Sequence, residues 1–253
     1  MARSPIVIGN WKMNGSMAAN SRLLEGLAQF SATDVLPEVV VCAPFVYLSQ
    51  ARDLLAKSSV KYGVQNVAYE SAGAFTGEVS VGMTAEFGAS HVIVGHSERR
   101  ALFAETDDVV AKKTALVLAE GLTPIVCVGE TAQQKEGGNT RAIVAQQLEA
   151  VMTAVGVSDL EKIIVAYEPV WAIGSGVSAS VEQIQSVHGF IREMLATVSI
   201  IAAEKVQILY GGSVNGTNAA EIFSLPDVDG GLFGGASLEV DSFCSIIRAA
   251  TKN

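Results

Sequence analysis

The chain has 253 residues, a length at which an α/β protein forms one or two domains. Hydrophobic residues make up 49% of it and charged residues only 17%, which excludes an intrinsically disordered chain. The net charge of -9 argues against a protein that binds nucleic acid or an acidic membrane, because both surfaces attract clustered Lys and Arg.

The sequence carries no mark of a secreted or membrane protein. No apolar run approaches the roughly 18 residues that a membrane-spanning helix needs. The apolar stretch before Asn10, Trp11 and Lys12 is too short for a signal peptide. We therefore expect a cytoplasmic protein that has no membrane partner.

Three cysteines, Cys42, Cys127 and Cys244, lie far apart and form no close pair of metal ligands. Cys42 and Cys127 stand in apolar runs that are typical of buried strands. Because their number is odd and the expected compartment is reducing, we expect inert thiols, no disulfide and no metal site.

Short, β-branched, almost wholly apolar runs recur along the chain, and such runs are typical of parallel strands buried on both faces. They are residues 5–9, 38–43, 60–65, 91–95, 124–129, 162–167, 207–210 and 230–233. Between them, apolar residues return at three- and four-residue spacing, which predicts helices. The clearest helical segments are residues 23–30, 109–119, 143–155, 184–195 and 243–250.

The eightfold alternation contains no Pro-, Gly- or Ser-rich linker and no break in composition. It therefore predicts a single-domain (β/α)8 barrel that spans residues 1–253. A doubly wound open sheet is the alternative, because periodicity alone does not tell whether a sheet closes.

Polar residues and glycines follow the ends of several predicted strands. They are Asn10 and Lys12, His96, Glu130, Glu168, the turn Gly211-Gly212-Ser213 and the turn Gly234-Gly235. In a parallel barrel the carboxyl ends of all strands meet at one rim, where active sites of this architecture lie. We therefore expect these residues to converge.

Five segments together resemble the signature segments of the triosephosphate isomerase family, in that family's order and spacing. They are residues 10–15 (NWKMNG), 94–100 (VGHSERR), 166–174 (AYEPVWAIG), 210–214 (YGGSV) and 234–238 (GGASL). The resemblance covers the chain from end to end and implies a TIM barrel that interconverts dihydroxyacetone phosphate and D-glyceraldehyde 3-phosphate. It also implies a cis-enediolate intermediate, a place in glycolysis and gluconeogenesis, and no metal or organic cofactor.

Glu168 and His96 are the candidates for proton transfer. Glu168 is either a solvated loop carboxylate or a general base, whose pKa apolar neighbours such as Trp171 and Ile173 would bring nearer to neutrality. His96 can simply begin the helix predicted over residues 97–103. The resemblance implies a neutral imidazole that moves protons between substrate oxygens, and a helix N-terminus favours the neutral form.

Lys12 directly follows an apolar strand, and it is either an ordinary solvated lysine or a cation for a phosphate and a developing oxyanion. The resemblance implies that Asn10 assists through its amide and that Trp11 belongs to the substrate-binding residues. It also implies that Glu98, which could be an ordinary first-turn charge, lies near Lys12 and orders the site.

The two glycine-rich turns are ordinary turn material when taken singly. Following the seventh and eighth strands together, they match the phosphate site that recurs in such barrels, where bare backbone N–H groups approach oxygens. No Walker-type Lys follows either turn, which argues against a nucleoside triphosphate. With the resemblance, they imply that the substrate phosphate is bound by Gly174, Ser213, Gly234 and Gly235.

Two loops complete the picture that the resemblance implies. A mobile lid comprises Pro169, Val170, Trp171, Ala172, Ile173, Gly174, Ser175 and Gly176, although a simple surface loop is the plainer interpretation. A second loop contains Phe75, Thr76 and Gly77 and, by resemblance, inserts Thr76 beside Asn10 and Glu98 of another subunit. The partners expected are therefore a phosphorylated three-carbon substrate and a second copy of the chain in a homodimer.

Four residues in the lid and the eighth-strand region depart from the family's usual pattern, and none of them is an expected catalytic group. They are Ser175, Val177, Gly231 and Phe233. Two alternatives stay open, namely another phosphosugar-handling barrel such as an aldolase or epimerase, and an inactive barrel that serves as a binding scaffold. The aldolase alternative needs a Schiff-base Lys well inside the barrel, whereas the lysines of the predicted strands, Lys61 and Lys162, stand at the starts of their strands.

Overall fold

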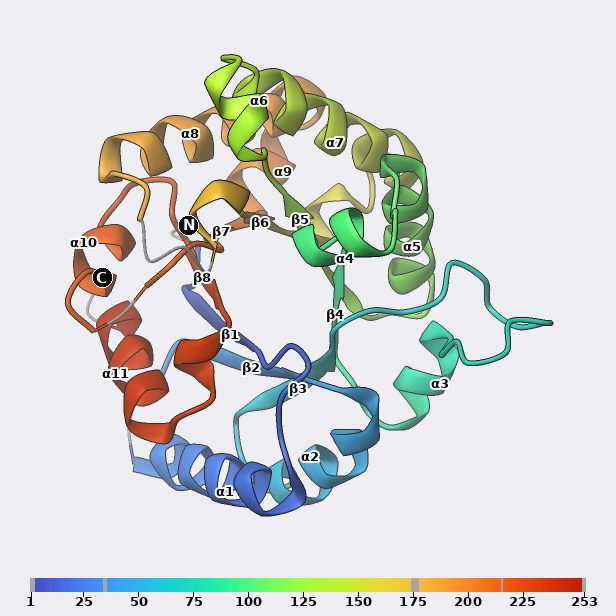
Figure 1. Ribbon diagram of the computed structural model, residues 1–253, viewed down its shortest axis with the longest axis vertical. Coiled ribbons are helices and arrows are strands. Elements are labelled where there is room, and N and C mark those ends of the chain that lie inside the picture. The colour runs from blue at the N-terminus through green and yellow to red at the C-terminus, as the bar shows by residue number, and fades with distance from the viewer. Residues whose placement is uncertain (1–2, 34–35, 174–177, 215, 252–253) are drawn as a thin grey trace.

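The computed structural model describes residues 3–33, 36–173, 178–214 and 216–251. Within them, eight parallel strands form a closed barrel in chain order, surrounded by helices (Figure 1). The strands are β1 (Ile6–Asn10), β2 (Glu38–Ala43), β3 (Lys61–Val64), β4 (His91–Val94), β5 (Thr123–Val128), β6 (Ile164–Tyr167), β7 (Gln207–Tyr210) and β8 (Gly230–Phe233). Ile6 of β1 pairs with Glu38 on one side and with Gly230 on the other, which closes the ring. The predicted (β/α)8 barrel is confirmed, and an open sheet is excluded.

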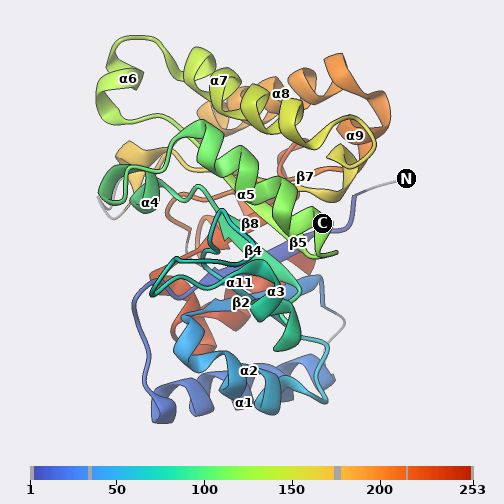
Figure 2. The same ribbon diagram turned by 90° about the vertical axis from the view of Figure 1, so that its right-hand side faces the viewer.

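The helices pack around the outside of the barrel. They are α1 (Met17–Thr33), α2 (Leu48–Leu55), α3 (Val81–Glu86), α4 (Ser97–Leu102), α5 (Asp107–Ala119), α6 (Ala132–Glu136), α7 (Thr140–Val155), α8 (Val181–Val198), α9 (Ile200–Lys205), α10 (Ala219–Phe223) and α11 (Val240–Thr251). Four 3-10 turns join them among the described residues: η1 (Phe45–Tyr47), η2 (Leu160–Lys162), η3 (Val170–Ala172) and η4 (Gly235–Ser237). Figure 2 shows α4 and α6 at one end of the barrel and α9 at the other.

Local capping explains why several helices begin before their apolar periodicity does. Thr106 caps α5 by accepting the Val109 N–H, so this helix starts two residues ahead of the predicted segment. Ser180 and Gln183 form a capping box that starts α8 at Val181. The predicted sixth strand is shortened at its start, because residues 160–162 form the turn η2.

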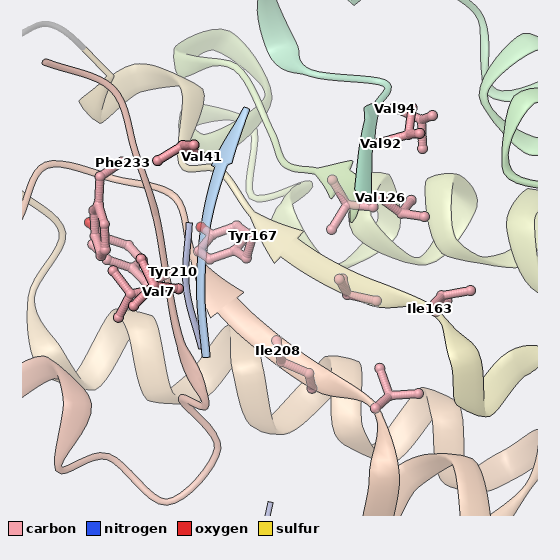
Figure 3. Close-up of a cluster of buried hydrophobic side chains, with 14 of the residues drawn as sticks. Val7, Val41, Val92, Val94, Val126, Ile163, Tyr167, Ile208, Tyr210 and Phe233 are labelled. Carbon is pink, nitrogen blue, oxygen red and sulfur yellow. The ribbon is translucent and has the colours of Figure 1, made fainter. Parts of the chain in front are cut away.

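Alternate side chains of the strands face two separate apolar cores. The barrel interior holds Ile6, Ile8, Val40, Cys42, Ile93, Ile125, Cys127, Ile164, Ala166, Leu209 and Leu232. The other face of each strand packs against the helices, and Figure 3 shows Val7, Val41, Val126 and Ile208 in that outer layer. Both faces are buried, as the apolar runs predicted.

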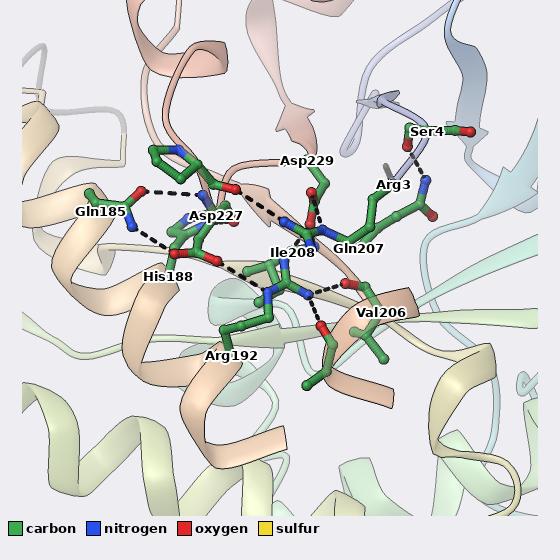
Figure 4. Close-up of polar contacts among 12 residues, drawn as sticks. Arg3, Ser4, Gln185, His188, Arg192, Val206, Gln207, Ile208, Asp227 and Asp229 are labelled. Carbon is green, nitrogen blue, oxygen red and sulfur yellow. Dashed lines mark hydrogen bonds and ion pairs between the residues drawn. The ribbon is translucent and has the colours of Figure 1, made fainter. Parts of the chain in front are cut away.

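A charged network lies at the amino-terminal ends of β7 and β8, opposite the rim where the carboxyl ends of the strands meet. Arg192 of α8 contacts Asp229, just before β8, at 2.6 Å, and Arg3 contacts the other oxygen of Asp229 at 2.6 Å. Asp229 also accepts the backbone N–H of Ile208, and Arg192 contacts Asp227 at 3.3 Å (Figure 4). Two cations and a backbone donor thus balance the nearly buried Asp229 carboxylate and join the first residues of the chain to α8 and the last two strands.

Candidate active site

A cavity of about 270 Å³ opens at the carboxyl ends of the strands. Its lining gathers residues from opposite ends of the chain, as the strand-end pattern predicted. The lining comprises Asn10, Lys12, His96, Glu168, Ile173, Gly211, Gly212, Ser213, Val214, Leu232, Phe233, Gly234, Gly235 and Ala236.

Glu168 follows β6 directly, and its side chain is only 2% exposed. One carboxylate oxygen lies 2.9 Å from His96 Nε2, and the other accepts the Ser97 N–H at 2.9 Å. A Cβ at Gly129 would lie 1.8 Å from the Glu168 carbonyl oxygen, so only glycine allows β5 to approach this residue so closely. The carboxylate is therefore held in a fixed position at the cavity wall.

The pKa of Glu168 differs from the expectation. Burial raises this pKa, but the contacts with His96 and the Ser97 N–H outweigh burial and hold it below its ordinary value. The expected shift toward neutrality is therefore wrong for this arrangement. Of the two apolar neighbours named from the sequence, Ile173 lines the cavity, whereas Trp171 does not.

His96 caps α4, as its position predicted. Its Nδ1 accepts the Glu98 N–H at 3.2 Å, so the proton of a neutral ring lies on Nε2, the nitrogen that faces Glu168. Burial lowers the pKa of His96, but the adjacent Glu168 carboxylate opposes this and the net shift is upward. The helix N-terminus was expected to favour the neutral ring, but in this structure the contact with the Glu168 carboxylate raises the pKa of His96.

Lys12 has a positive φ of 53°, which is uncommon for a residue with a side chain. The Asn10 side-chain oxygen accepts the Lys12 N–H at 3.0 Å and supports this backbone turn. Lys12 Nζ lies 2.7 Å from Glu98, which is the proximity that the resemblance implied. A Cβ at Gly234 would lie 3.2 Å from Lys12 Cε, so the glycine leaves room for the ammonium group at the cavity.

The two glycine turns follow the paired strands β7 and β8 and both line the cavity. The Ser213 hydroxyl donates to the Ala172 carbonyl at 3.3 Å. A Cβ at Gly212 would lie 2.1 Å from the Tyr210 hydroxyl, which explains the glycine there. The departures at Gly231 and Phe233 are one feature, because the Phe233 ring occupies the space that a Cβ at Gly231 would take, 1.9 Å from its Cζ.

Trp11 is the one described binding residue that the structure places elsewhere. Its side chain is 1% exposed and belongs to the outer apolar core, and it does not line the cavity. The assignment of Trp11 to substrate binding stays a prediction that its side chain does not support, because the strand alternation that turns Asn10 toward the rim turns the next residue outward. Gly174, Ser175, Gly176 and Val177 lie outside the described residues.

Glu130 is a site residue whose contacts could not be read from the sequence. It is 1% exposed, accepts the Tyr167 hydroxyl at 3.1 Å and accepts Trp171 Nε1–H at 2.9 Å. It therefore holds η3, the turn that follows Glu168. Its position at a strand end was the only signal in the sequence.

The loop with Phe75, Thr76 and Gly77 projects from the barrel between β3 and α3 (Figure 1). Phe75 is 39% exposed and contacts the Tyr69 ring edge to face. A second cavity of about 620 Å³ lies beside Asn10, Lys12 and Glu98. Exposed apolar residues border it: Met13, Leu102 and Phe103, which are 96%, 75% and 62% exposed.

Within the described part of the chain, no three His, Cys, Asp or Glu side chains are grouped to hold a metal. All three cysteines are buried and unbridged, and burial raises the pKa of the Cys42 thiol. None of the described helices is both long and apolar enough to cross a membrane.

Comparison with known proteins finds relatives over nearly the whole of this chain. The family model for triosephosphate isomerase matches residues 5–250. The triosephosphate isomerase of Cupriavidus necator is 53% identical over 247 residues, covering 98% of this chain and 100% of the relative. Those of Thiobacillus denitrificans and Nitrosococcus oceani are 52% and 50% identical, covering 99% and 98% of this chain and 100% and 99% of the relatives.

Proposed function

Because the chain belongs to the triosephosphate isomerase family, we propose that it interconverts dihydroxyacetone phosphate and D-glyceraldehyde 3-phosphate. One observation carries the proposal: a buried carboxylate and an imidazole, 2.9 Å apart, face a cavity that also receives a lysine and two glycine turns. This set matches the needs of proton transfer on a small phosphorylated carbonyl compound.

The substrate phosphate binds to backbone N–H groups of Ser213, Gly234 and Gly235, with Gly174 as a fourth donor outside the described residues. Glycines at these turns support this role, because no side chain keeps an oxygen away from the backbone. The three-carbon part then lies against Glu168 and His96, whose side chains line the same cavity.

Glu168 removes the proton from the carbon beside the carbonyl and returns it to the neighbouring carbon. To do so, its carboxylate exchanges the Ser97 N–H and His96 contacts for the substrate, and losing these donors raises its pKa toward that of an effective base. His96, freed from the carboxylate and still accepting the Glu98 N–H, is neutral and passes protons between the two substrate oxygens.

Negative charge on the enediolate is stabilised by Lys12 and by the Asn10 amide. Glu98 holds the Lys12 ammonium in place, and the cavity wall keeps the charge in a poorly solvated environment where it acts strongly. A carboxylate base, an imidazole and an ammonium group supply the chemistry of these steps, so we propose that no metal or organic cofactor takes part.

The segment from Pro169 to Gly176 acts as the lid. Ile173 already lines the cavity beside Glu168, and the glycines beyond it provide a backbone donor for the phosphate. Enclosing the enediolate prevents loss of its phosphate, a side reaction that yields methylglyoxal.

The partner is a second copy of the chain. The exposed apolar residues around the 620 Å³ cavity suit the projecting loop of another protomer, with Thr76 beside Asn10 and Glu98. Sedimentation that found a fully active monomer at nanomolar concentration would contradict the homodimer. We also propose a cytoplasmic location, with no nucleic-acid or membrane partner.

The test is a coupled assay that follows conversion of glyceraldehyde 3-phosphate to its ketose isomer. We expect turnover by the native protein, a large loss in Glu168→Asp and a larger one in Glu168→Ala. Near-native turnover in Glu168→Ala would refute the assignment of the base, and an inactive native protein would favour the scaffold alternative. An aldolase is disfavoured because the described strands contain a single lysine, Lys61, which is exposed at the start of β3 and lies outside the barrel interior.

A further inference from the structure

The turn η3 begins two residues after Glu168, and residues of the segment that leads from β5 into α6 contact it. Glu130 accepts Trp171 Nε1–H at the ring edge, and its carbonyl accepts the Val170 N–H at 3.1 Å. Lys135 Nζ lies over the ring face, 3.0 Å from its centroid. The indole is therefore held both in its plane and from one face.

The sequence of this segment explains why Lys135 reaches the ring. Thr131 and Gln134 form a reciprocal capping box, with Thr131 N–H donating to the Gln134 side chain at 2.8 Å. The box begins α6 at Ala132, two residues after Glu130, and places Lys135 over the Trp171 ring that Glu130 also contacts. Glu130 and Lys135 thus act on Trp171 from one rigid turn.

Lys135 has no competing carboxylate in the part of the chain that the structure describes. None of the ion pairs among those residues involves Lys135, which is half-buried at a cavity of about 330 Å³ that also includes Glu130, Glu182, Trp171 and Arg141. A partly desolvated ammonium over an indole face is the strongest form of the cation–π contact. The ring therefore provides the principal stabilising contact for this charge.

We propose that Lys135 is a positioning residue, which fixes η3 through the Trp171 ring and thereby places Ile173 at the cavity. The inference rests on the proposed function, in which the segment that begins at η3 covers the substrate. When the ammonium is absent, residues 170–173 sample more arrangements, and substrate binding has to restore the ordered one. Such a loss of preorganisation raises KM and leaves kcat nearly unchanged.

The test uses Trp11→Phe as the background, because the chain has two tryptophans and Trp171 then reports alone. Lys135→Met removes the cation and keeps most of the side-chain volume. Lys135→Arg retains a cation that stacks on aromatic rings. Arg141→Gln is the matched control, because it removes a positive charge from the same cavity but from a residue whose ring contact is with Phe190.

In Lys135→Met we expect an altered Trp171 emission, greater quenching by acrylamide, and a KM about two- to fivefold higher with kcat within about twofold. Lys135→Arg restores both readouts, and Arg141→Gln changes neither. Unchanged emission and KM in Lys135→Met, or equal changes in Arg141→Gln, would overturn the proposal. An inactive native protein would refute the proposed function alone, because the emission and quenching readouts decide whether Lys135 fixes the ring.

Discussion

Replacing Gly211 by alanine tests whether the position of Glu168 governs the reaction. A Cβ on residue 211 would lie 2.8 Å from Glu168 Cγ, about 0.7 Å inside the usual carbon–carbon contact distance. The Gly211 backbone is not in the left-handed region, so alanine is accommodated by moving the Glu168 side chain. Because the contacts with His96 and the Ser97 N–H fix the carboxylate, this displacement reaches the reactive oxygens.

A misplacement approaching 1 Å lowers turnover by on the order of 10- to 100-fold. We expect kcat of Gly211→Ala to fall by this amount in the coupled assay, while the thermal midpoint changes by only a few degrees, as is typical of about 1 kcal/mol. The control is Gly82→Ala in α3, where the nearest atom to a new Cβ lies at 4.0 Å and kcat should not change. Native kcat in Gly211→Ala would refute the link between this contact and the base.

Three further predictions concern pH, stability and charge. Burial lowers the pKa of His188 to about 4, so stability that is present above pH 6.5 is lost as pH falls from 6.5 to 4. In His188→Phe, urea unfolding should show that this loss of unfolding free energy is smaller by roughly 3 kcal/mol. Parallel curves of unfolding free energy against pH for the native protein and the variant would contradict this prediction. Asp229→Ala leaves Arg192 without its closest carboxylate and should lower the free energy of unfolding by about 3–5 kcal/mol. Its kcat should not change, because the network lies at the rim opposite the cavity. A cost below about 1 kcal/mol would refute this role of Asp229. Lys12→Met should lower kcat/KM by about 100-fold or more, and an effect below tenfold would remove Lys12 from the charge-stabilising role.

The sequence predicts the barrel well because each strand is specified locally. An apolar run of four to six residues flanked by turn residues has few alternatives, and the strands lie within about two residues of their predicted bounds. Convergence of Asn10, Lys12, His96 and Glu168 follows from topology alone, since parallel strands deliver their carboxyl ends to one rim.

Properties that depend on distances between side chains could not be predicted in the same way. The pKa of Glu168 is lowered by two donors, His96 and the Ser97 N–H, which tertiary packing brings to the carboxylate. The residue type and its apolar neighbours in the sequence predicted a raised pKa, which is the opposite direction. The contacts of Glu130 and Lys135 with Trp171 join residues about 40 positions apart, so no local pattern in the sequence predicts them. The burial of the Trp11 side chain could not be predicted either, because a signature segment groups residues that point to opposite faces of one strand.

The most direct test of the proposed site is a crystal structure with a phosphate-bearing analogue of the enediolate. We expect the phosphate to lie against the Ser213, Gly234 and Gly235 backbones and the two enediolate oxygens to lie within hydrogen-bond distance of His96. The Glu168 carboxylate should lie over the carbon skeleton, released from the Ser97 N–H. An analogue bound away from both glycine turns, or a Glu168 carboxylate still held by Ser97 and out of reach of the carbons, would contradict it.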